Sequence, residues 1–390
     1  MKYFNLLRIG SDIYMKCRCC GLQLPEVASI HYSNMPKSAQ YFPDAEHVKA
    51  ERGVNLELFQ CHYCGMIQLG GYPVPYYRDV IRASGVSKEM REFRKNFFLK
   101  WIRKYRLQGK KILEIGCGAG EYISIMQEIG ANVYGIEHLA SSVDKDILNG
   151  YKVFNAFIES EEFQIPKAPY DAFYILNFLE HIPCPGEFLR GIANNLSNGA
   201  VGIIEVPNMD MILKRHLYSE LIQDHLLYFT ADTLKLLLSM NGFEILSCYS
   251  CWHEYILRAE VKKREALDLK EFYKSQKYIQ NDVDKFLDLM KSQNISVAIW
   301  GAGHQSLANL SILNIKKYVC CVIDSAEFKQ NRYTPATHIP VVSPDILEKG
   351  KIGAVLIMAA GYSNEINEII KRKYPEIISV TLGVNGIEKN

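Results

Sequence analysis

Two short cysteine pairs near the start of the chain have the spacing of metal ligands. The members of each pair are three positions apart, and a glycine follows each pair directly. Such a glycine frees the backbone so that both sulfurs can face one ion, and two such knuckles make a closed tetrahedral zinc site. The predicted ligands of a structural Zn²⁺ are Cys17, Cys20, Cys61 and Cys64.

Two alternatives to zinc are a redox pair of the thioredoxin type and a set of unrelated buried thiols. The redox alternative lacks the strand and helix that flank such a pair. Four thiolates also leave no open position for a catalytic metal. Structural zinc is therefore the prediction, with Cys19 as a spare thiol that points elsewhere. Cys248 and Cys251 form a third pair, which we interpret as packing thiols in a late hairpin.

A second site is indicated where an apolar strand runs into closely spaced glycines. Residues 112–115 precede Gly116, Gly118 and Gly120, and a helical pattern and a second strand then end at Glu137. Such glycines let the backbone approach a ligand, and the start of the helix offers unpaired N–H groups. An acid at the end of the second strand can bind ribose hydroxyls. The segment predicts a nucleotide or nucleoside cofactor, against the alternative of a turn that binds nothing.

The residues around the glycines narrow the choice of cofactor. Gly-x-Gly-x-Gly matches only part of the dinucleotide fingerprint, and a carboxylate inside the strand, Glu114, would repel a pyrophosphate. The stretch resembles class I S-adenosylmethionine (SAM) methyltransferases, in which such an acid supports the loop that receives the ammonium end of the cofactor. The resemblance implies SAM as the methyl donor, with the binding residues Glu114, Gly116, Gly118, Gly120, Glu137 and Asn177.

Two histidines are expected on loops that face the methyl donor. His181 follows the fourth predicted strand, and Asp224 and His225 lie in an insertion after the fifth. An imidazole of near-neutral pKa beside a carboxylate can accept a proton from a substrate. A single histidine is more often a satisfied structural residue, but two at one sheet edge favour catalysis. The predicted catalytic residues are His225, His181 and Asp224.

The composition limits the class of protein. A chain of 390 residues is too long for one core, so two or three domains are expected. The net charge of +2 gives no electrostatic reason to expect nucleic acid or membrane as a partner. No apolar run approaches the ~20 residues that span a bilayer, and the first 17 residues lack an adequate signal sequence. Eleven cysteines without that signal indicate a reducing compartment, so we expect a cytoplasmic protein.

The order of predicted elements gives an α/β fold in three parts. Residues 1–75 form the zinc-binding domain. Residues 76–262 form a Rossmann-like class I methyltransferase domain, in which strand–helix units and a final hairpin make a seven-stranded sheet. Its first segment, residues 76–105, is a helical lid or a plain surface helix, with a break at 84–87 and a cap at Ser87.

The last part of the chain is predicted to be a Rossmann-like α/β domain that binds the substrate. Residues 263–390 include linker helices, since a charged helical pair extends over residues 260–293. A Gly-Ala-Gly turn at residues 301–303 follows the first strand of this domain, and Asp324 is the acid analogous to Glu137. This turn predicts either a second nucleotide-type site or a scaffold without a ligand.

Together these features resemble the sugar C-methyltransferases that act on nucleotide-linked keto-deoxysugars. The match covers nearly the whole chain, and residues 324–340 look like the family's D-x-x-x-x-K-x-G-x-x-x-P-G-T-x-I-P. The resemblance implies structural zinc, SAM and a small-molecule acceptor of the sugar-nucleotide class. It also implies that His225 is the general base for the carbon beside the ketone, with His181 and Asp224 assisting.

Three departures from that family fall where substrate is expected. Residues 222–225 read Ile-Gln-Asp-His where the family has Tyr-x-Glu-His. Gln305 replaces a lysine of the family's Gly-Ala-x-x-Lys turn, and residues 360–362 replace a Trp-Asn pair. The leading hypothesis is therefore C-methylation of a keto-deoxysugar nucleotide. The alternatives are an O- or N-methyltransferase on the same scaffold and a non-catalytic protein that binds SAM and a sugar nucleotide.

Overall fold

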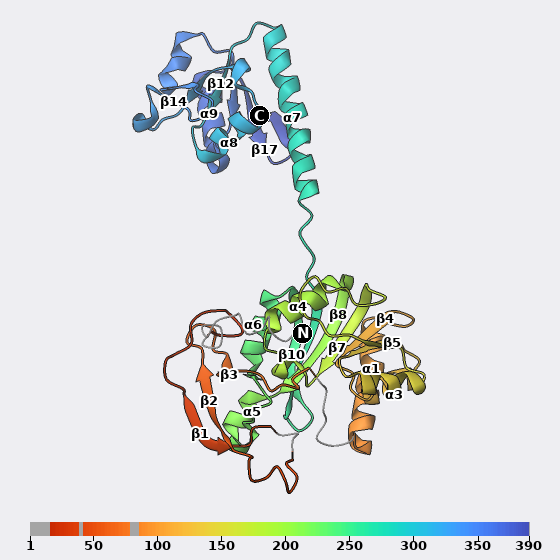
Figure 1. The fold of residues 1–390 in the computed structure, drawn as a ribbon. Coiled ribbons are helices and arrows are strands. Elements are labelled where there is room, and N and C mark those ends of the chain that lie inside the picture. The colour runs from red at the N-terminus through yellow and green to blue at the C-terminus, as the bar shows by residue number, and fades with distance from the viewer. Residues whose placement is uncertain (1–15, 39–41, 79–85, 390) are drawn as a thin grey trace. The chain divides into compact units, whose positions relative to one another are not determined.

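The computed structural model describes residues 16–38, 42–78 and 86–389 (Figure 1). The chain divides into two compact units, Met1–Glu265 and Ala266–Asn390. The expectations about a leader sequence and about a break at Ser84 and Gly85 lie outside the described residues. Within the described ranges, no helix is long and apolar enough to cross a membrane.

The first unit is built on a seven-stranded sheet, as predicted. Its order is β10-β11-β8-β7-β4-β5-β6. The parallel strands are β4 (Lys111–Ile115), β5 (Asn132–Glu137), β6 (Val153–Asn155), β7 (Tyr170–Leu176) and β8 (Leu196–Pro207). The antiparallel hairpin is β10 (Phe243–Cys251) and β11 (Ile256–Lys263). The order runs outward in both directions from β4, so the carboxyl ends of β4 and β7 flank the crevice where such sheets bind ligands.

Both faces of this sheet are covered by helices, which explains why the central strand β4 is buried on both faces and carries apolar side chains at Ile112, Leu113 and Ile115. Ile112 packs into one core, and Leu113 and Ile115 pack into the other. The Ile112 side carries α1 (Lys88–Lys104), α2 (Glu121–Glu128) and α3 (Ala140–Leu148). The opposite side carries α4 (Pro185–Asn194) and α6 (Ala231–Met240). A strand buried on both faces reads as a continuous hydrophobic run.

Helix α1 is attached to the sheet by an ion network that is wholly buried. Ser87 caps the helix as predicted, since its hydroxyl accepts from the Met90 N–H. Further along, Arg94 lies 2.5 Å from one carboxylate oxygen of Glu205 in β8, and Arg258 of β11 lies 2.5 Å from the other. All three side chains are at most 3% exposed. One carboxylate thus joins the helix to two strands.

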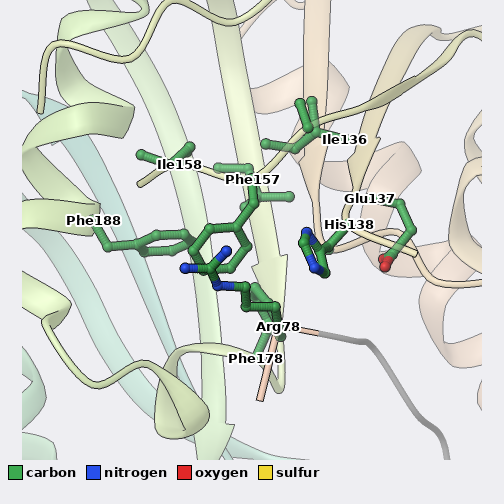
Figure 2. A pocket seen from close by; sticks show the side chains of 11 residues that line it. Arg78, Ile136, Glu137, His138, Phe157, Ile158, Phe178 and Phe188 are labelled. Carbon is green, nitrogen blue, oxygen red and sulfur yellow. The ribbon is translucent and has the colours of Figure 1, made fainter. Parts of the chain in front are cut away.

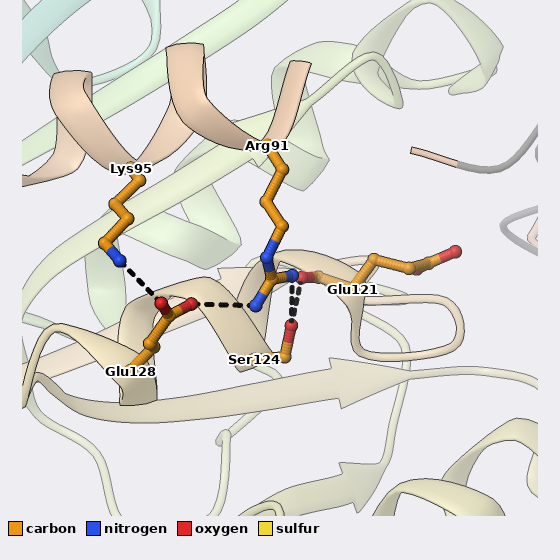
Figure 3. Close-up of polar contacts among 5 residues, drawn as sticks. All are labelled: Arg91, Lys95, Glu121, Ser124 and Glu128. Carbon is orange, nitrogen blue, oxygen red and sulfur yellow. Dashed lines mark hydrogen bonds and ion pairs between the residues drawn. The ribbon is translucent and has the colours of Figure 1, made fainter. Parts of the chain in front are cut away.

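A second ion network joins α1 to α2 at the surface. Glu128 of α2 receives both Arg91 and Lys95 of α1, at 2.8 and 2.5 Å. Figure 3 shows the two cations reaching across from α1, with Arg91 also donating to Ser124 near the start of α2. Because these groups are partly exposed, solvent screens their attraction.

A small four-stranded sheet joins the cysteine-bearing segment to the insertion after β8. Its order is β1 (Ile30–Met35), β2 (Val54–Gln60), β3 (Ile67–Leu69) and β9 (Leu227–Tyr228). The first two strands form an antiparallel hairpin between the two cysteine pairs. The insertion also contains α5 (Met209–Lys214) and η4 (Tyr218–Glu220). Residues of α5, together with Leu217 and Leu221 on either side of η4, share an apolar core with this sheet.

The second unit is a separate α/β fold with its own seven-stranded sheet, in the order β14-β15-β13-β12-β16-β17-β18. The parallel strands are β12 (Val297–Trp300), β13 (Val319–Ile323), β15 (Pro340–Val342), β16 (Ala354–Ile357) and β17 (Ile378–Gly383). Short antiparallel strands, β14 (Arg332–Tyr333) and β18 (Gly386–Lys389), close the two edges. The longer helices are α7 (Leu269–Ser292), α8 (His304–Ile312) and α9 (Ser363–Lys373), and the short ones are η5 (Lys316–Tyr318), η6 (Glu327–Lys329), η7 (Pro344–Lys349) and η8 (Ala360–Tyr362).

One sequence prediction for this region was wrong. The helical pair is a single helix, α7, because no glycine or proline interrupts it, and residues 260–263 belong to β11. The buried side chains of α7 are in its second half, at Val283, Leu287 and Met290, whereas Phe272 is 79% exposed. Ser363 is the first residue of α9, and the chain continues past β17 into β18.

The two ion networks give matched predictions for stability. Replacing Glu205→Gln leaves two buried guanidinium groups without a counter-charge, and we expect a loss of about 3–5 kcal/mol. The matched change Glu128→Gln breaks a screened pair and should barely move the thermal unfolding midpoint. Thermal unfolding followed by circular dichroism compares the two variants. Equal midpoints for Glu205→Gln and the unchanged protein would contradict the importance of the buried network.

Candidate functional site

The glycine turn after β4 has the backbone that its sequence predicts. Gly116, Gly118 and Gly120 have φ of 72°, 58° and 71°, in the left-handed region that favours glycine. A Cβ at Gly120 would stand 2.7 Å from a carboxylate oxygen of Asp146. The turn therefore requires glycine for conformation and, at Gly120, for space.

Two buried acids lie beside this turn. Glu137, at the end of β5, accepts from the Gly118 N–H at 2.9 Å and from the Leu139 N–H at 3.0 Å. Glu114, inside β4, accepts from the hydroxyl of Tyr174 in the neighbouring strand β7 at 2.8 Å. Both acids are 1% exposed. The structure thus places each predicted acid beside the turn, and Glu137 contacts the turn directly.

A small cavity opens beside the glycine turn at the carboxyl ends of β4, β5 and β6 (Figure 2). Glu137 and His138 lie on one side of it, and the rings of Phe157 and Phe188 lie on the other. Its lining residues are Arg78, Ile115, Gly116, Ile136, Glu137, His138, Ala156, Phe157, Ile158, Phe178 and Phe188. The cavity has room for about one water molecule. Its aromatic walls and one acid match a planar heterocycle with hydroxyl groups in chemistry, and the walls must move apart to admit one.

Arg78 covers one aromatic wall of this cavity. Its guanidinium carbon lies 5.0 Å from the centre of the Phe157 ring, and its terminal nitrogen lies 3.0 Å from Glu159. Sequence reasoning missed both Arg78 and Phe157. The position of Phe157, just beyond the third predicted strand, was a usable signal because that strand ends at the same sheet edge. Asn177, which was predicted to bind the cofactor, is exposed at the end of β7 and donates its N–H to the Glu205 carbonyl.

The two predicted histidines meet, although they are 44 positions apart in the sequence. His181 is the last residue of η3 (Leu179–His181), and its ring centre lies 4.8 Å from that of His225. The Leu226 N–H donates to the Glu180 carbonyl at 2.9 Å and fastens the two loops together. His181 Nδ1 lies 2.8 Å from the Asp224 carbonyl oxygen, so Nδ1 carries the proton and Nε2 has the free lone pair.

Asp224 contacts the histidine pair through its backbone and not, as predicted, through its carboxylate. Its carboxylate accepts from the Tyr76 hydroxyl at 2.6 Å, and it is its backbone carbonyl that contacts His181. Another carboxylate lies beside the imidazoles, since Glu180 Oε1 is 3.9 Å from His181 Nε2. Sequence reasoning missed both Glu180 and Tyr76 as neighbours of this site.

Burial sets the protonation state of these groups. It lowers the pKa of His225 to about 3, with a smaller contribution from the charge of His181. Burial also lowers the pKa of His181 and raises that of Glu180 to about 8. Near neutral pH both imidazoles are therefore uncharged and keep a free lone pair, and the same lowering of the pKa makes them weaker proton acceptors than an exposed histidine.

The four predicted cysteine ligands converge. The Sγ atoms of Cys17 and Cys64 are 3.4 Å apart, those of Cys20 and Cys61 are 3.7 Å apart, and all four sulfurs lie within 4.8 Å of one another. Zn–S bonds of about 2.3 Å in a tetrahedron require separations of roughly 3.8 Å, so the set fits zinc. Cys19 is buried but is not a member of this group.

The glycine turn of the second unit repeats the arrangement of the first. Gly301 has a φ of 117°, and a Cβ there would stand 2.7 Å from the Met358 carbonyl oxygen. The Ala302 N–H donates to Asp324 at 2.7 Å, and Lys329 also contacts this carboxylate at 3.0 Å. The predicted acid is therefore in place, with its charge balanced by a lysine.

Comparison with known families matches both units. Residues 84–248 match the family of methyltransferase domains, and residues 256–376 match the C-methyltransferase C-terminal domain. The C-methyltransferase NovU of Streptomyces niveus is 21% identical over an aligned length of 385 residues, and the match covers 90% of this chain and 91% of that protein. A ubiquinone biosynthesis O-methyltransferase of Bordetella avium is 32% identical over 102 residues, which are 24% of this chain and 42% of that protein.

Solved structures resemble part of the chain. A SAM-dependent methyltransferase from Clostridium acetobutylicum is 13% identical with a TM-score of 0.38, and the match covers 45% of this chain and 92% of that one. The PH0226 protein from Pyrococcus horikoshii is 14% identical with a TM-score of 0.39, over 50% of this chain and 100% of that one.

The brace between Glu137 and the glycine turn gives a prediction for cofactor binding. Glu137→Ala removes the acceptor of two N–H groups at the turn, each hydrogen bond worth about 0.5–1.5 kcal/mol, so SAM should bind roughly tenfold or more weakly. Isothermal titration with SAM measures this, and Asp144→Ala on the exposed face of α3 is the control. Unchanged affinity in Glu137→Ala would remove this acid from the cofactor site.

Proposed function

Because this chain is a SAM-dependent methyltransferase that carries the C-terminal domain of the C-methyltransferases, we propose that it methylates a carbon atom of a nucleotide-linked keto-deoxysugar. The observation that carries the proposal is the uncharged histidine pair, His181 and His225, on the loops that leave β7 and β8. Those loops leave the same edge of the sheet as the glycine turn. A base at that edge can act on an acceptor that faces the methyl donor.

In the proposed reaction His225 removes a proton from the carbon beside the ketone. SAM supplies an electrophilic methyl group when bound, and the carbon that has lost its proton takes that group. His225 accepts a proton only while it is uncharged, which its burial ensures near neutral pH. His181 contributes position, because its Nδ1–H is fixed on the Asp224 carbonyl and its ring stands edge-on to His225.

The cofactor is proposed to occupy the cavity beside the glycine turn. Phe157 and Phe188 would enclose the adenine, and Glu137 would bind the ribose hydroxyls. Gly116, Gly118, Gly120 and Asn177 would line the remaining path toward the histidines, with Glu114 supporting the turn from within the sheet.

The acceptor class rests on the second unit and on the likeness of residues 324–340 to the motif of the sugar-nucleotide enzymes. Asp324 and Lys329, which that motif contains, form an ion pair beside the Gly301 turn. We therefore assign substrate binding to residues 263–390. The cytoplasmic location that the free cysteines predict fits this role.

O-methylation is the second candidate function. It is favoured by the similarity to a ubiquinone biosynthesis O-methyltransferase, which is 32% identical to this chain over 102 aligned residues. It is also favoured by Ile222, which stands where the sugar C-methyltransferases have a tyrosine. An O-methyltransferase would use His225 to deprotonate a hydroxyl rather than a carbon.

We further propose that the four cysteines hold a structural zinc ion. Cys17, Cys20, Cys61 and Cys64 supply a closed set of sulfur ligands, which leaves no position for a substrate. The ion would fasten the two knuckles and thereby the start of β3, which begins three residues after Cys64.

The role of His225 is tested by its replacement. His225→Gln should lower methyl transfer by about 10²–10⁴-fold, the usual contribution of a general base, while SAM affinity stays unchanged. The assay uses labelled SAM with a panel of keto-deoxysugar nucleotides, and ¹³C NMR of the product distinguishes a C-methyl from an O-methyl group. Transfer only to hydroxyl groups would support the second candidate, and full activity of His225→Gln would reject this base.

The zinc assignment is tested by metal analysis of the purified full-length chain. We expect about one zinc per chain, its loss in Cys17→Ser, and its retention in Cys19→Ser, because four thiolates complete the tetrahedral site. Retention of zinc by Cys17→Ser would contradict the ligand set. The Cys19→Ser variant controls for the removal of a buried thiol from the same knuckle.

A further inference from the structure

Glu180 adds a third side chain that can bind a metal to the histidine pair. One ligand atom from each of Glu180, His181 and His225 lies within 4.8 Å of the other two. Among the described residues, the only other group of this kind is the set of four cysteines. The three side chains therefore form a cluster of two imidazoles and one carboxylate, which is separate from the cysteine site.

The carboxylate of Glu180 has an unsatisfied oxygen. The side chain is 1% exposed, and within the described part of the chain its Oε2 has no hydrogen-bond partner. Leaving a buried polar atom without a partner costs about 1–3 kcal/mol. A cation bound between this oxygen and the imidazoles would remove that cost.

The orientation of His181 also suits a metal ligand. Its Nδ1–H is held by the Asp224 carbonyl at 2.8 Å, which leaves the Nε2 lone pair on the side of Glu180 Oε1. Histidine ligands usually donate their other N–H to a carbonyl or carboxylate in this way, since that bond fixes the ring. The backbone bond from Leu226 to Glu180 keeps the loop of His225 beside the other two residues.

From this geometry we propose that Glu180, His181 and His225 bind one divalent first-row transition-metal ion. Two imidazoles and one carboxylate are a donor set of Zn²⁺ and Fe²⁺ enzymes, and they leave further positions open. Bonds of about 2.0–2.2 Å bring ligand atoms to roughly 3–3.5 Å from one another, so the side chains must move inward by about an ångström. Mg²⁺ prefers a shell of oxygen atoms and is a poor competitor here.

Metal binding at this site excludes the reaction proposed above. The free lone pair of His225 either coordinates the ion or accepts the substrate proton, and it cannot do both. We therefore expect Co²⁺ or Zn²⁺ in excess to inhibit methyl transfer. This consequence rests on the proposed function, whereas the binding of the ion does not.

Titration of the full-length, zinc-loaded chain with Co²⁺ tests the site. We expect visible absorption from one additional Co²⁺ per chain, without the sulfur-to-metal band that would mark replacement of zinc at the cysteines. Loss of a group that only orients a ligand costs 10–100-fold in affinity, so Glu180→Gln, His181→Gln and His225→Gln should each weaken binding by at least about tenfold. His216→Gln, an exposed histidine of the same insertion, is the matched control.

Each outcome of the titration bears on the proposal. Unchanged SAM affinity and thermal unfolding in Glu180→Gln would show that its weaker Co²⁺ binding is local. Failure to saturate with one Co²⁺, equal affinity in all four variants, or displacement of Co²⁺ by equimolar Mg²⁺ would overturn the site. If Co²⁺ binds as expected but methyl transfer continues undiminished, the metal site stands and His225 is rejected as the base.

Discussion

The buried carboxylate of Glu205 is the contact on which the arrangement of the first unit depends. It lies between Arg94 and Arg258 and so joins helix α1, strand β8 and the final hairpin. Its backbone carbonyl accepts from the Asn177 N–H, so the end of β7 is fixed to the end of β8 at the same residue. The two histidine-bearing loops both begin just beyond this point. Because both loops start from strand ends that are fixed to each other, segments distant in sequence can bring their imidazoles together.

The two units hold their glycine turns with the same kind of hydrogen bond. In each, a strand runs into a glycine turn, and an acid from the next strand accepts a backbone N–H of that turn: Glu137 from Gly118, and Asp324 from Ala302. The acid of the first unit borders a cavity, whereas the acid of the second is neutralised in part by Lys329. The shared geometry gives a stable turn, and the surrounding charges decide what each turn can bind.

The sequence predicted the parts of the molecule whose pattern is local. Buried strands, the glycine turn and the cysteine knuckles can each be recognised from a pattern of a few consecutive residues. The predicted class I α/β fold is confirmed. Contacts between distant segments could not be predicted in this way. Nothing near Glu180 in sequence shows that its carboxylate faces His225, and the interruption expected between residues 260 and 293 had no breaking residue to produce it. The likeness to C-methyltransferases is confirmed by matches to both of their domains.

The pairing of β3 with β9 has a consequence for how the protein matures. Strand β3 begins three residues after Cys64, and its Gln68 pairs with Leu227, two residues after His225. The segment that carries the predicted base thus supplies strand β9 to the four-stranded sheet, whose other strands come from the cysteine-bearing part of the chain. A newly made chain would complete its histidine pair only after that part has folded. Supply of the zinc ion proposed for the cysteines would then govern how much of the synthesised protein becomes competent.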